Sequence, residues 1–559
     1  MTDNTHGCEE TVTDRVDEAG NQDTTYDVIV VGFGGAGACA AIAAADAGAS
    51  VLVLDRSYGG GSTFHSGGVV YAGGGTSTQR AADIADTPDN MYAYLHKEIG
   101  GAVADQTLRR FVDTSPATID WLETQGVEFE GSVCPYKTSY PTNRHYLYYS
   151  GNELAAGFSE IADPAPRGHR TRAKNFSGAT FFGQLRESAL RKGVTFRPLA
   201  EVSGLIVDAG AVVGVEFHAP APDRMPGKGF EKLVKLSEKL QVWHNSSGIR
   251  LNRIVERDRR KRATPHRAHA RAGVILSTGG FGFNRSLVDE HAPAWSAIDA
   301  LGTVGDDGTA LRLGAQVDAR TDKLGSMSGW RFIAPPSGFL EGIVVDGNGV
   351  RFANEQLYGA TMTTPMVEEH QARAFLIVDA ATWRRARGQT RTQAAFFHVP
   401  QLAYIFGPTG HTRAGTLTEL AAKIGVSPDG LTATAAQHNS DIENNRPDAF
   451  GKKDEVRHRL EEGPFYAVDL SPGVSVTYPF KFITLGGLVV DEATGQVVRE
   501  DGETIRGLYA AGRAAVGLCS NSYVSGLSLA DAVFSGRRAG EYAAAGVSTS
   551  TTIETQERQ

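Results

Sequence analysis

The chain of 559 residues contains little cysteine and no long apolar run. Its four cysteines (Cys8, Cys39, Cys134 and Cys519) are scattered and form no CxxC pair, which argues against a disulfide scaffold, a structural zinc site and a c-type haem. No stretch of about 18 apolar residues is present, so no transmembrane helix is predicted. The first 24 residues lack the basic and apolar regions of a signal peptide, so we expect a cytoplasmic protein.

A strong excess of one charge is also lacking. There are 55 Lys and Arg against 64 Asp and Glu, and the net charge of −9 argues against nucleic acid as a partner. With 41% hydrophobic and 21% charged residues, the composition is that of a globular protein and not of a disordered one. A chain of this length is expected to form two or more domains.

Glycine is abundant instead. The 66 glycines are roughly 12% of the chain, against a norm of about 7%. They show no Gly-X-Y period, which excludes collagen, and they cluster between apolar runs. Such positions are typical of tight turns and of backbone that approaches a ligand closely.

The pattern along the chain predicts an α/β protein. An apolar strand at 27–31, a glycine turn at 32–37, an Ala-rich helix to about 47 and a strand at 50–54 form a βαβ unit of a parallel sheet. We expect a Rossmann-like cofactor-binding domain, discontinuous in sequence, from residues 25–317 and 478–545. An α+β catalytic or cap domain at 318–477 is inserted into it, and disordered tails are expected at 1–24 and 546–559.

Residues 219–270 look like a basic insertion. From Arg224 to Arg271 there are 14 Lys or Arg and 4 Asp or Glu, a local net charge of +10. Four apolar residues have loosely helical spacing: Phe230, Leu233, Val234 and Leu240. The following segment, QVWHNSSGIRLNRIV, suggests a β-hairpin around Ser247-Gly248. One interpretation is a solvated surface excursion; the other is an amphipathic patch over 222–268 that contacts anionic lipid.

The glycine turn is a dinucleotide-binding motif in the right context. Residues 32–37 read GFGGAG, which fits GxGxxG after a strand and before a helix. Gly32 permits the turn, Gly34 lets the backbone approach a pyrophosphate, and Gly37 lets the helix pack on the sheet. The next strand ends at Asp55, 18 residues after Gly37, where a carboxylate can accept both ribose hydroxyls.

Three further glycine clusters favour FAD over NAD. They are SYGGGSTFHSGGVVYAGGG at 57–75, STGGFG at 277–282 and GLYAAGR at 507–513. An NAD half-domain needs only one such loop, whereas FAD needs close backbone approach along its whole length. The glycines therefore indicate one elongated cofactor.

Over residues 25–545 the sequence resembles the fumarate reductase/succinate dehydrogenase flavoprotein superfamily. The resemblance rests on STGGFG, on GDDGTALRLGA at 305–315 and on GLYAAG, in the order typical of that family. Within it, KTSYPTNRHYLYYSGNE at 137–153 and SYVSGLSLADAVFSGRRAG at 522–540 are most similar to 3-ketosteroid Δ4-(5α)-dehydrogenases.

The motif and the resemblance together imply a set of FAD-binding residues. They are Gly32, Gly34, Gly35, Ala36, Gly37, Asp55, Arg56, Ser62, Thr63, Ser66, Gly67, Gly68, Val202, Thr278, Gly279, Gly280, Gly512, Arg513, Leu527, Ser528 and Leu529. The last three begin a helix whose N–H groups should point at the flavin and favour its reduced, anionic form. We expect non-covalent FAD, because His65 lies too close to Gly67-Gly68 to match the flavin-linked histidine of succinate dehydrogenases.

Departures from the family pattern indicate a different substrate. After RFANE, Tyr358 and Gly359 stand where soluble fumarate reductases carry a proton-donating arginine. Near the carboxyl end, Tyr523-Val524-Ser525-Gly526 replaces an arginine that clamps a carboxylate. A dicarboxylate needs such paired cations, whereas hydroxyl groups suit a neutral, mostly apolar ketone.

The resemblance assigns roles in dehydrogenation at C4 and C5 of a 3-ketosteroid. Tyr523 would donate a hydrogen bond to the C3 oxygen, Ser525 would take the C4 proton, and Tyr358 would receive that proton and pass it to solvent. C5 would deliver hydride to flavin N5. The alternative for each residue is structural: Ser525 as a helix cap, and Tyr358 as a half-buried tyrosine. Three further tyrosines could line a steroid slot or pack in the core: Tyr140, Tyr146 and Tyr148.

Other activities remain open at this point. A Δ1-dehydrogenase would have a tyrosine followed four residues later by glycine, whereas Gly526 follows Tyr523 after three. An ene-reductase would run the same chemistry backwards on an enone or enoate, and a non-enzymatic FAD protein would use the basic insertion for docking. The sequence contains no second nucleotide fingerprint, haem motif or iron–sulfur cysteines, so we expect an external electron acceptor, for instance a quinone.

Overall fold

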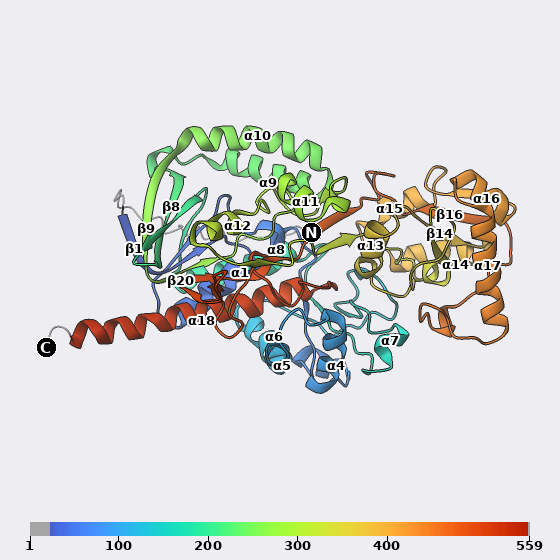
Figure 1. Cartoon of the computed structure of the whole chain (residues 1–559), viewed down its shortest axis with the longest axis horizontal. Helices are drawn as coiled ribbons and strands as arrows, with labels where there is room; N and C mark the ends of the chain where they lie inside the picture. Colours follow the sequence, from blue (N-terminus) through green and yellow to red (C-terminus); the bar gives the residue numbers. More distant parts are fainter. Residues whose placement is uncertain (1–22, 557–559) are drawn as a thin grey trace, which may run out of the picture.

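The protein is elongated, with a large sheet at one end and a smaller sheet at the other (Figure 1). The computed structural model describes the backbone of residues 23–556 and the side chains of residues 24–546. The large sheet comprises β1 (Asp23–Val31), β2 (Val51–Leu54), β6 (Thr195–Arg197), β7 (Glu201–Asp208), β8 (Ala211–Pro220), β9 (Ala263–Leu276), β19 (Gln496–Val498) and β20 (Thr504–Ala510).

The centre of the large sheet is parallel, which confirms the predicted fold class. Its order is β19-β20-β9-β1-β2-β6, and β1 runs parallel to both β2 and β9. The antiparallel pair β7–β8 extends the sheet from β9. Because the carboxyl ends of parallel strands meet at one edge, the turns after β1, β2, β9 and β20 lie together there, which is where ligands bind in such sheets.

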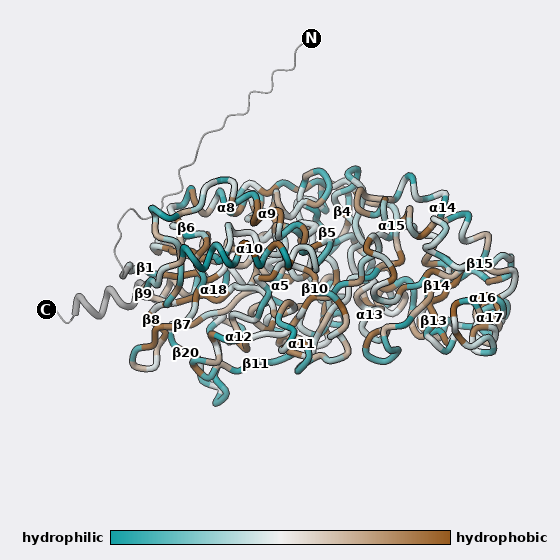
Figure 2. The backbone as a smooth tube through the Cα atoms, turned by 90° about the horizontal axis from the view of Figure 1, so that it is seen from above, coloured by the Kyte–Doolittle hydropathy of each residue, from teal (hydrophilic) through white to brown (hydrophobic). Residues whose placement is uncertain are grey.

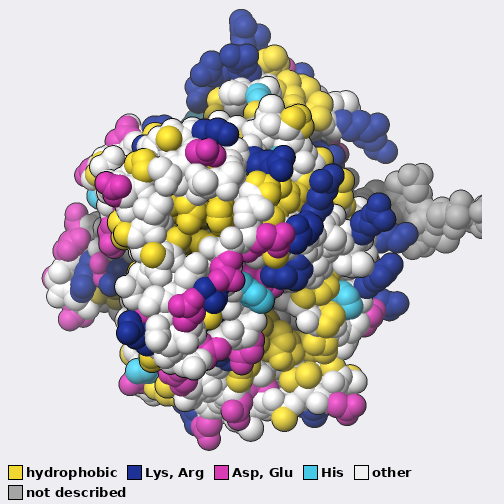
Figure 3. Space-filling model, turned by 90° about the vertical axis from the view of Figure 1, so that its right-hand side faces the viewer, with side chains coloured by type: hydrophobic (Ala, Val, Ile, Leu, Met, Phe, Trp, Pro, Cys, Tyr) yellow, Lys and Arg dark blue, Asp and Glu magenta, His cyan; other side chains and the backbone are white. Residues whose placement is uncertain are grey.

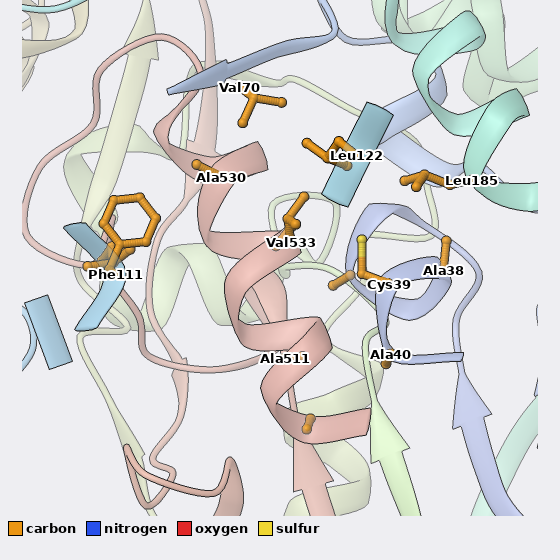
Figure 4. Close-up of a cluster of buried hydrophobic side chains, with 14 of the residues drawn as sticks. Ala38, Cys39, Ala40, Val70, Phe111, Leu122, Leu185, Ala511, Ala530 and Val533 are labelled. Carbon is orange, nitrogen blue, oxygen red and sulfur yellow. The ribbon is translucent and has the colours of Figure 1, made fainter. Parts of the chain in front are cut away.

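Two helices from opposite ends of the chain pack on the sheet. α1 (Gly35–Asp46) and α18 (Leu527–Gln556) cross so closely that a Cβ on Gly536 or Gly540 would lie 2.4 or 2.2 Å from backbone carbonyl oxygens of α1. Figure 4 shows Val533 of α18 next to Cys39 of α1 and facing Leu122, within one buried apolar cluster. Leu122 belongs to α6 (Ser115–Thr124), which follows α4 (Pro88–Ile99) and α5 (Asp105–Asp113).

The smaller sheet forms the core of the inserted segment. Its strands are β13 (Ile343–Asp346), β14 (Ala374–Val378), β15 (Thr412–Ala414) and β16 (Phe465–Asp469), all antiparallel in the order β13-β14-β16-β15. Helices α16 (Leu417–Ile424) and α17 (Pro428–Glu443) bury Leu420 and Leu431 against one face. The segment is joined to the large domain through β12 (Met327–Trp330), which pairs antiparallel with β17 (Lys481–Thr484).

The basic insertion is a pair of helices and not a hairpin of strands. α9 (Lys228–Trp243) and α10 (Asn245–Arg262) pack against each other above the large sheet, and α10 is hydrophilic along its length (Figures 1 and 2). The predicted β-hairpin at 241–255 is therefore wrong. Gly248 is not a turn residue: it allows a close helix contact, since a Cβ there would lie 2.3 Å from the Gln241 nitrogen.

The ends of the chain differ in part from the predicted tails. Residues 1–22 lie outside the described range, and residues 23 and 24 already belong to β1. α18 continues to Gln556, so the disordered tail predicted from 546 is wrong for residues 546–556. Lengthening an existing helix requires no new nucleation, which lets polar residues continue it. Among the helices of the described part of the chain, none is both long and apolar enough to cross a bilayer.

Candidate active site

A continuous pocket runs along the carboxyl edge of the parallel strands and on to the inserted domain. All but three of the residues predicted to contact the cofactor line it. The three exceptions, Gly37, Gly280 and Leu527, lie behind the wall and support it. A Cβ on Gly37 would lie 2.0 Å from the Gly32 carbonyl oxygen, Gly280 N–H donates to Asp306, and Leu527 is buried in the core.

The glycine turn after β1 leaves room for a ligand at one position. Gly32 has φ +99°, and a Cβ there would lie 2.6 Å from the Ser277 carbonyl oxygen, so only glycine fits. Gly34 is different, because its φ is −91° and the nearest atom to an added Cβ would be 3.8 Å away. Gly34 lines the pocket, so the absence of a side chain there leaves space for a ligand and is not required by the packing of the protein.

Asp55 is held at the end of β2 by the turn itself. Its carboxylate accepts hydrogen bonds from the Phe33 and Ser57 N–H groups, both at 2.7 Å. Burial raises the pKa of Asp55 despite these bonds. The side chain lines the pocket, where its remaining acceptor capacity can serve the hydroxyls of a ribose.

The insertion covers the part of the pocket next to Asp55. The sequence did not suggest this position. Seven of its side chains line the wall: Val234, Glu238 and Val242 from α9, and Asn252, Val255, Glu256 and Arg259 from α10. Arg259 is 2% exposed and pairs with Glu201 and Glu256 at 2.6 Å, and Arg56 pairs with Asp307 at 2.6 Å. The insertion is therefore not only a solvated excursion. The sequence feature that could have indicated this contact is the presence of a few carboxylates and valines among the many lysines and arginines of the insertion.

The three residues predicted to be catalytic all line the pocket, away from the glycine turn: Tyr358, Tyr523 and Ser525. The Tyr358 and Tyr523 ring centroids are 6.2 Å apart, and interaction with Ser525 partly offsets the rise that burial causes in the Tyr358 pKa. Burial raises the pKa of both tyrosines, so both phenols remain protonated hydrogen-bond donors at neutral pH. Tyr358 is 5% exposed and lines the pocket.

One short loop positions this trio of hydroxyls. Ser150 accepts from the Ser525 N–H and donates its hydroxyl to the Ser525 carbonyl oxygen, which fixes the turn before α18. Asn152 accepts from the Tyr358 N–H at 2.5 Å, where Tyr358 precedes α13 (Gly359–Glu368). The loop thus aligns two segments that are more than 150 residues apart in sequence.

The three predicted slot tyrosines have different positions. Tyr140 lines the pocket and donates its hydroxyl to the Gly67 and Asn175 carbonyl oxygens. Tyr146 is not part of the wall and donates to the Ala173 carbonyl oxygen. Tyr148 is also behind the wall, and its hydroxyl lies 3.0 Å from Ser525 Oγ. Tyr148 therefore contacts the hydroxyl of Ser525 and does not line the slot.

Four further aromatic side chains contribute to the pocket wall, and no motif pointed to them. Phe176, Trp330, Phe332 and Phe397 all line the pocket. Trp330 is the last residue of the linking strand β12, Phe332 follows that strand, and Phe397 precedes α15 (His398–Ile405). The inserted domain therefore supplies much of an apolar slot beside the trio, as expected for a flat, largely apolar ligand.

The pocket fits an FAD molecule. Bare backbone at Gly34, the Asp55 carboxylate and the first turn of α18 provide the pyrophosphate, ribose and anion-binding features that this cofactor needs. The His65 Nε2 atom is buried at the pocket wall with no hydrogen-bond partner among the described residues, its nearest ion-pair partner being Glu238 at 3.8 Å, so a ligand oxygen can pair with it. The described residues include no cluster of His, Cys, Asp and Glu suited to a metal ion.

Comparison with known proteins agrees with this geometry. The FAD binding domain family matches residues 27–528. The chain is 37% identical over 501 residues to the 3-oxo-5-alpha-steroid 4-dehydrogenase of Comamonas testosteroni, covering 87% of this chain and 92% of that protein. It is 24% identical to the fumarate reductase (cytochrome) of Shewanella frigidimarina, covering 93% of this chain and 77% of that one.

A solved structure is similar over nearly the whole chain. It is the 3-ketosteroid-delta4-(5alpha)-dehydrogenase of Rhodococcus jostii RHA1 in complex with 4-androstene-3,17-dione, with a TM-score of 0.76 and 29% identity. The match covers 94% of this chain and 98% of that one. These matches confirm the predicted superfamily resemblance and the FAD cofactor. The chain therefore belongs to the FAD binding domain family.

Proposed function

We propose that the protein is an FAD-dependent 3-ketosteroid dehydrogenase that introduces the C4–C5 double bond into 3-keto-5α-steroids. The observation that carries the proposal is the trio of hydroxyls, Tyr358, Tyr523 and Ser525, beside an aromatic slot in the pocket that fits FAD. The similarity to two dehydrogenases named for this reaction supports it.

The chain's own residues handle the ketone and the proton. Tyr523 donates a hydrogen bond to the C3 oxygen and stabilises the enolate as it forms. Ser525 takes the C4 proton as its own hydroxyl proton passes to the neighbouring tyrosine hydroxyls, Tyr148 and Tyr358, and a proton leaves to solvent from Tyr358, which lines the pocket. FAD, when bound without a covalent link, supplies N5 as the acceptor of the C5 hydride. The first turn of α18, through Ser528 and Leu529, presents backbone N–H groups to the cofactor.

The charges along the pocket disfavour a dicarboxylate substrate. The arginines in its wall are Arg56, Arg259 and Arg513, and each is paired with a carboxylate. Arg331 follows the slot residue Trp330, but it is buried and donates to the Tyr478 and Ser471 carbonyl oxygens. In the described part of the wall, no free guanidinium is available for a second carboxylate, which supports a neutral ketone.

The decisive experiment is anaerobic reduction of the bound flavin by a panel of steroids. A saturated 3-keto-5α-steroid should bleach the flavin, and the product should have a double bond at C4–C5 only. A product with a C1–C2 double bond would instead support the Δ1-dehydrogenase alternative. No reduction by any ketosteroid, with FAD bound, would contradict the proposal and favour an ene-reductase or a binding protein.

In turnover, we infer that the electrons pass to an external acceptor such as a quinone.

We also infer peripheral contact with anionic membranes through the outer face of the insertion. Exposed lysines and arginines cover this face: Lys228, Lys232, Lys235, Lys239, Arg250, Arg253, Arg257, Arg260 and Lys261. Leu236 and Ile254, 49% and 60% exposed, lie among them. Figure 3 shows dark-blue side chains with yellow ones at the top of the molecule, where Figure 1 places α10. Such a face suits an anionic bilayer, which also dissolves steroids.

Charge reversal should abolish this contact. A variant with Lys232, Lys239, Arg253 and Arg257 changed to Glu should no longer float with vesicles that contain phosphatidylserine, while the unaltered protein should. A matched control reverses four exposed basic residues elsewhere: Arg144, Lys174, Arg387 and Arg391. Equal flotation of all three proteins, or none by the unaltered protein, would contradict the membrane proposal.

A further inference from the structure

The serine Ser139 lies among the aromatic side chains of the substrate slot. Ser139 lines the pocket, and its Oγ lies 3.2 Å from His398 Nε2. Ser139 belongs to the loop before β4 (Leu147–Tyr148), whereas His398 begins α15 in the inserted domain. The contact therefore joins the two domains at the slot.

The histidine determines which way this hydrogen bond runs. The Ala395 N–H donates to His398 Nδ1 at 3.1 Å, so that nitrogen carries no proton. Burial lowers the pKa of His398 to about 3, so the ring is neutral at physiological pH. The ring proton must then be on Nε2, which donates it to Ser139 Oγ.

This direction leaves the serine's own hydrogen free. Ser139 Oγ is the acceptor in its bond with His398, and no described side chain or carbonyl accepts the Ser139 hydroxyl hydrogen. Because Ser139 lines the pocket, a ligand oxygen is the natural partner for that hydrogen.

A continuous row of rings separates Ser139 from the catalytic trio. Successive ring centroids are 6.2 Å apart for Tyr523–Tyr358, 5.1 Å for Tyr358–Phe332, 6.2 Å for Phe332–Trp330, 6.2 Å for Trp330–Phe397 and 4.0 Å for Phe397–His398. All of these rings except that of His398 line the pocket. The slot thus has a hydroxyl donor at Tyr523, apolar rings along its length and a second hydroxyl donor at Ser139.

We propose that Ser139 donates a hydrogen bond to an oxygen at the ring-D end of the steroid, and that it selects 3-ketosteroids with a carbonyl or hydroxyl at C17. The inference rests on the proposed function, which places the C3 oxygen at Tyr523. C3 and C17 lie at opposite ends of the fused rings, and along the wall Tyr523 and Ser139 are separated by the rings of Tyr358, Phe332, Trp330 and Phe397. His398 is a positioning residue that orients the Ser139 hydroxyl from behind.

The test compares two substrates that differ only at the far end. They are 5α-androstane-3,17-dione, which has an oxygen at C17, and 5α-androstan-3-one, which has none. Ser139→Ala should lower kcat/KM for the dione about three- to tenfold more than kcat/KM for the 3-one, the effect of one neutral hydrogen bond. Ser139→Thr, which keeps a hydroxyl, should retain most of the preference for the dione.

The outcomes separate this inference from the proposed function. Equal losses for both substrates in Ser139→Ala, or no loss for either, would overturn the role of Ser139 while flavin reduction still supported a ketosteroid dehydrogenase. If neither steroid reduces the flavin of the unaltered enzyme, the proposed function itself fails. Dissociation constants from steroid-induced changes in the oxidised flavin spectrum provide a second readout that does not depend on turnover.

Discussion

Tyr523→Phe should lower kcat/KM for a 3-keto-5α-steroid by about 100- to 1,000-fold, the range measured for loss of one oxyanion-stabilising donor. The phenylalanine keeps the ring that packs against Tyr358, so only the hydrogen bond to the C3 oxygen is removed. Ser525→Ala should have an effect of about 100- to 10,000-fold, because the C4 proton then has no acceptor in place. Stopped-flow measurement of flavin reduction under anaerobic conditions reports both steps directly.

Three observations make this result interpretable. FAD content should be unchanged in both variants, since neither side chain is needed for the cradle at β1 and β2. Tyr509→Phe is a matched control, because Tyr509 is a buried tyrosine of β20 outside the pocket wall, and its loss of a hydroxyl should leave the rate unchanged. Tyr358→Phe and Tyr148→Phe then measure how the two neighbours of Ser525 share the proton. Near-normal reduction by Tyr523→Phe or Ser525→Ala would remove that residue from the mechanism.

Gly34→Ala should give a folded protein that retains little FAD. The added Cβ meets nothing closer than 3.8 Å in the protein, and φ at this residue is −91°, so neither packing nor backbone is strained. The methyl group would instead intrude on the space from which the backbone approaches the pyrophosphate. Overpacking of a tight site typically weakens it by about 1–3 kcal/mol, or about 10- to 100-fold in the FAD dissociation constant.

Flavin absorbance after dialysis, with titration of added FAD, measures the loss. Gly183→Ala in α8 (Gly178–Arg191) is the control, because a Cβ there meets nothing within 4 Å and lies outside the pocket wall. Circular dichroism should show that both variants are folded. Full FAD retention by Gly34→Ala would mean that the cofactor does not approach this turn.

The sequence was most informative where function depends on the backbone. The turn at 32–37 could be recognised because its glycines meet requirements of the local backbone: a sharp turn, room for a pyrophosphate and close packing of the helix on the sheet. These requirements fix the spacing of the glycines, so the same spacing recurs in other chains. The same holds for the replacement of arginines by Tyr358, Tyr523 and Ser525, since the pattern around them made the exchange visible. The parallel sheet followed from apolar strands that are buried on both faces.

The insertion and the carboxyl-terminal tail show where local patterns failed. In α9 and α10, Ser247-Gly248 resembled a hairpin turn, but two helices approach each other there and the glycine serves their contact. The polar residues 546–556 resembled a tail, yet they continue a helix that packing upstream had already formed. In both segments the deciding interaction lies outside the window that a local pattern samples.

The sequence by itself determined the parallel α/β fold and the FAD cofactor, and it predicted the three hydroxyl residues of the proposed mechanism. Only the tertiary structure brought Tyr148 to Ser525, placed α9 and α10 over the cradle, and joined Ser139 to His398 across the two domains. The physical reason is the separation in sequence between the residues that interact. A glycine turn is specified by the conformations of neighbouring residues, whereas these side-chain contacts join segments up to 377 residues apart and exist only after the chain has packed.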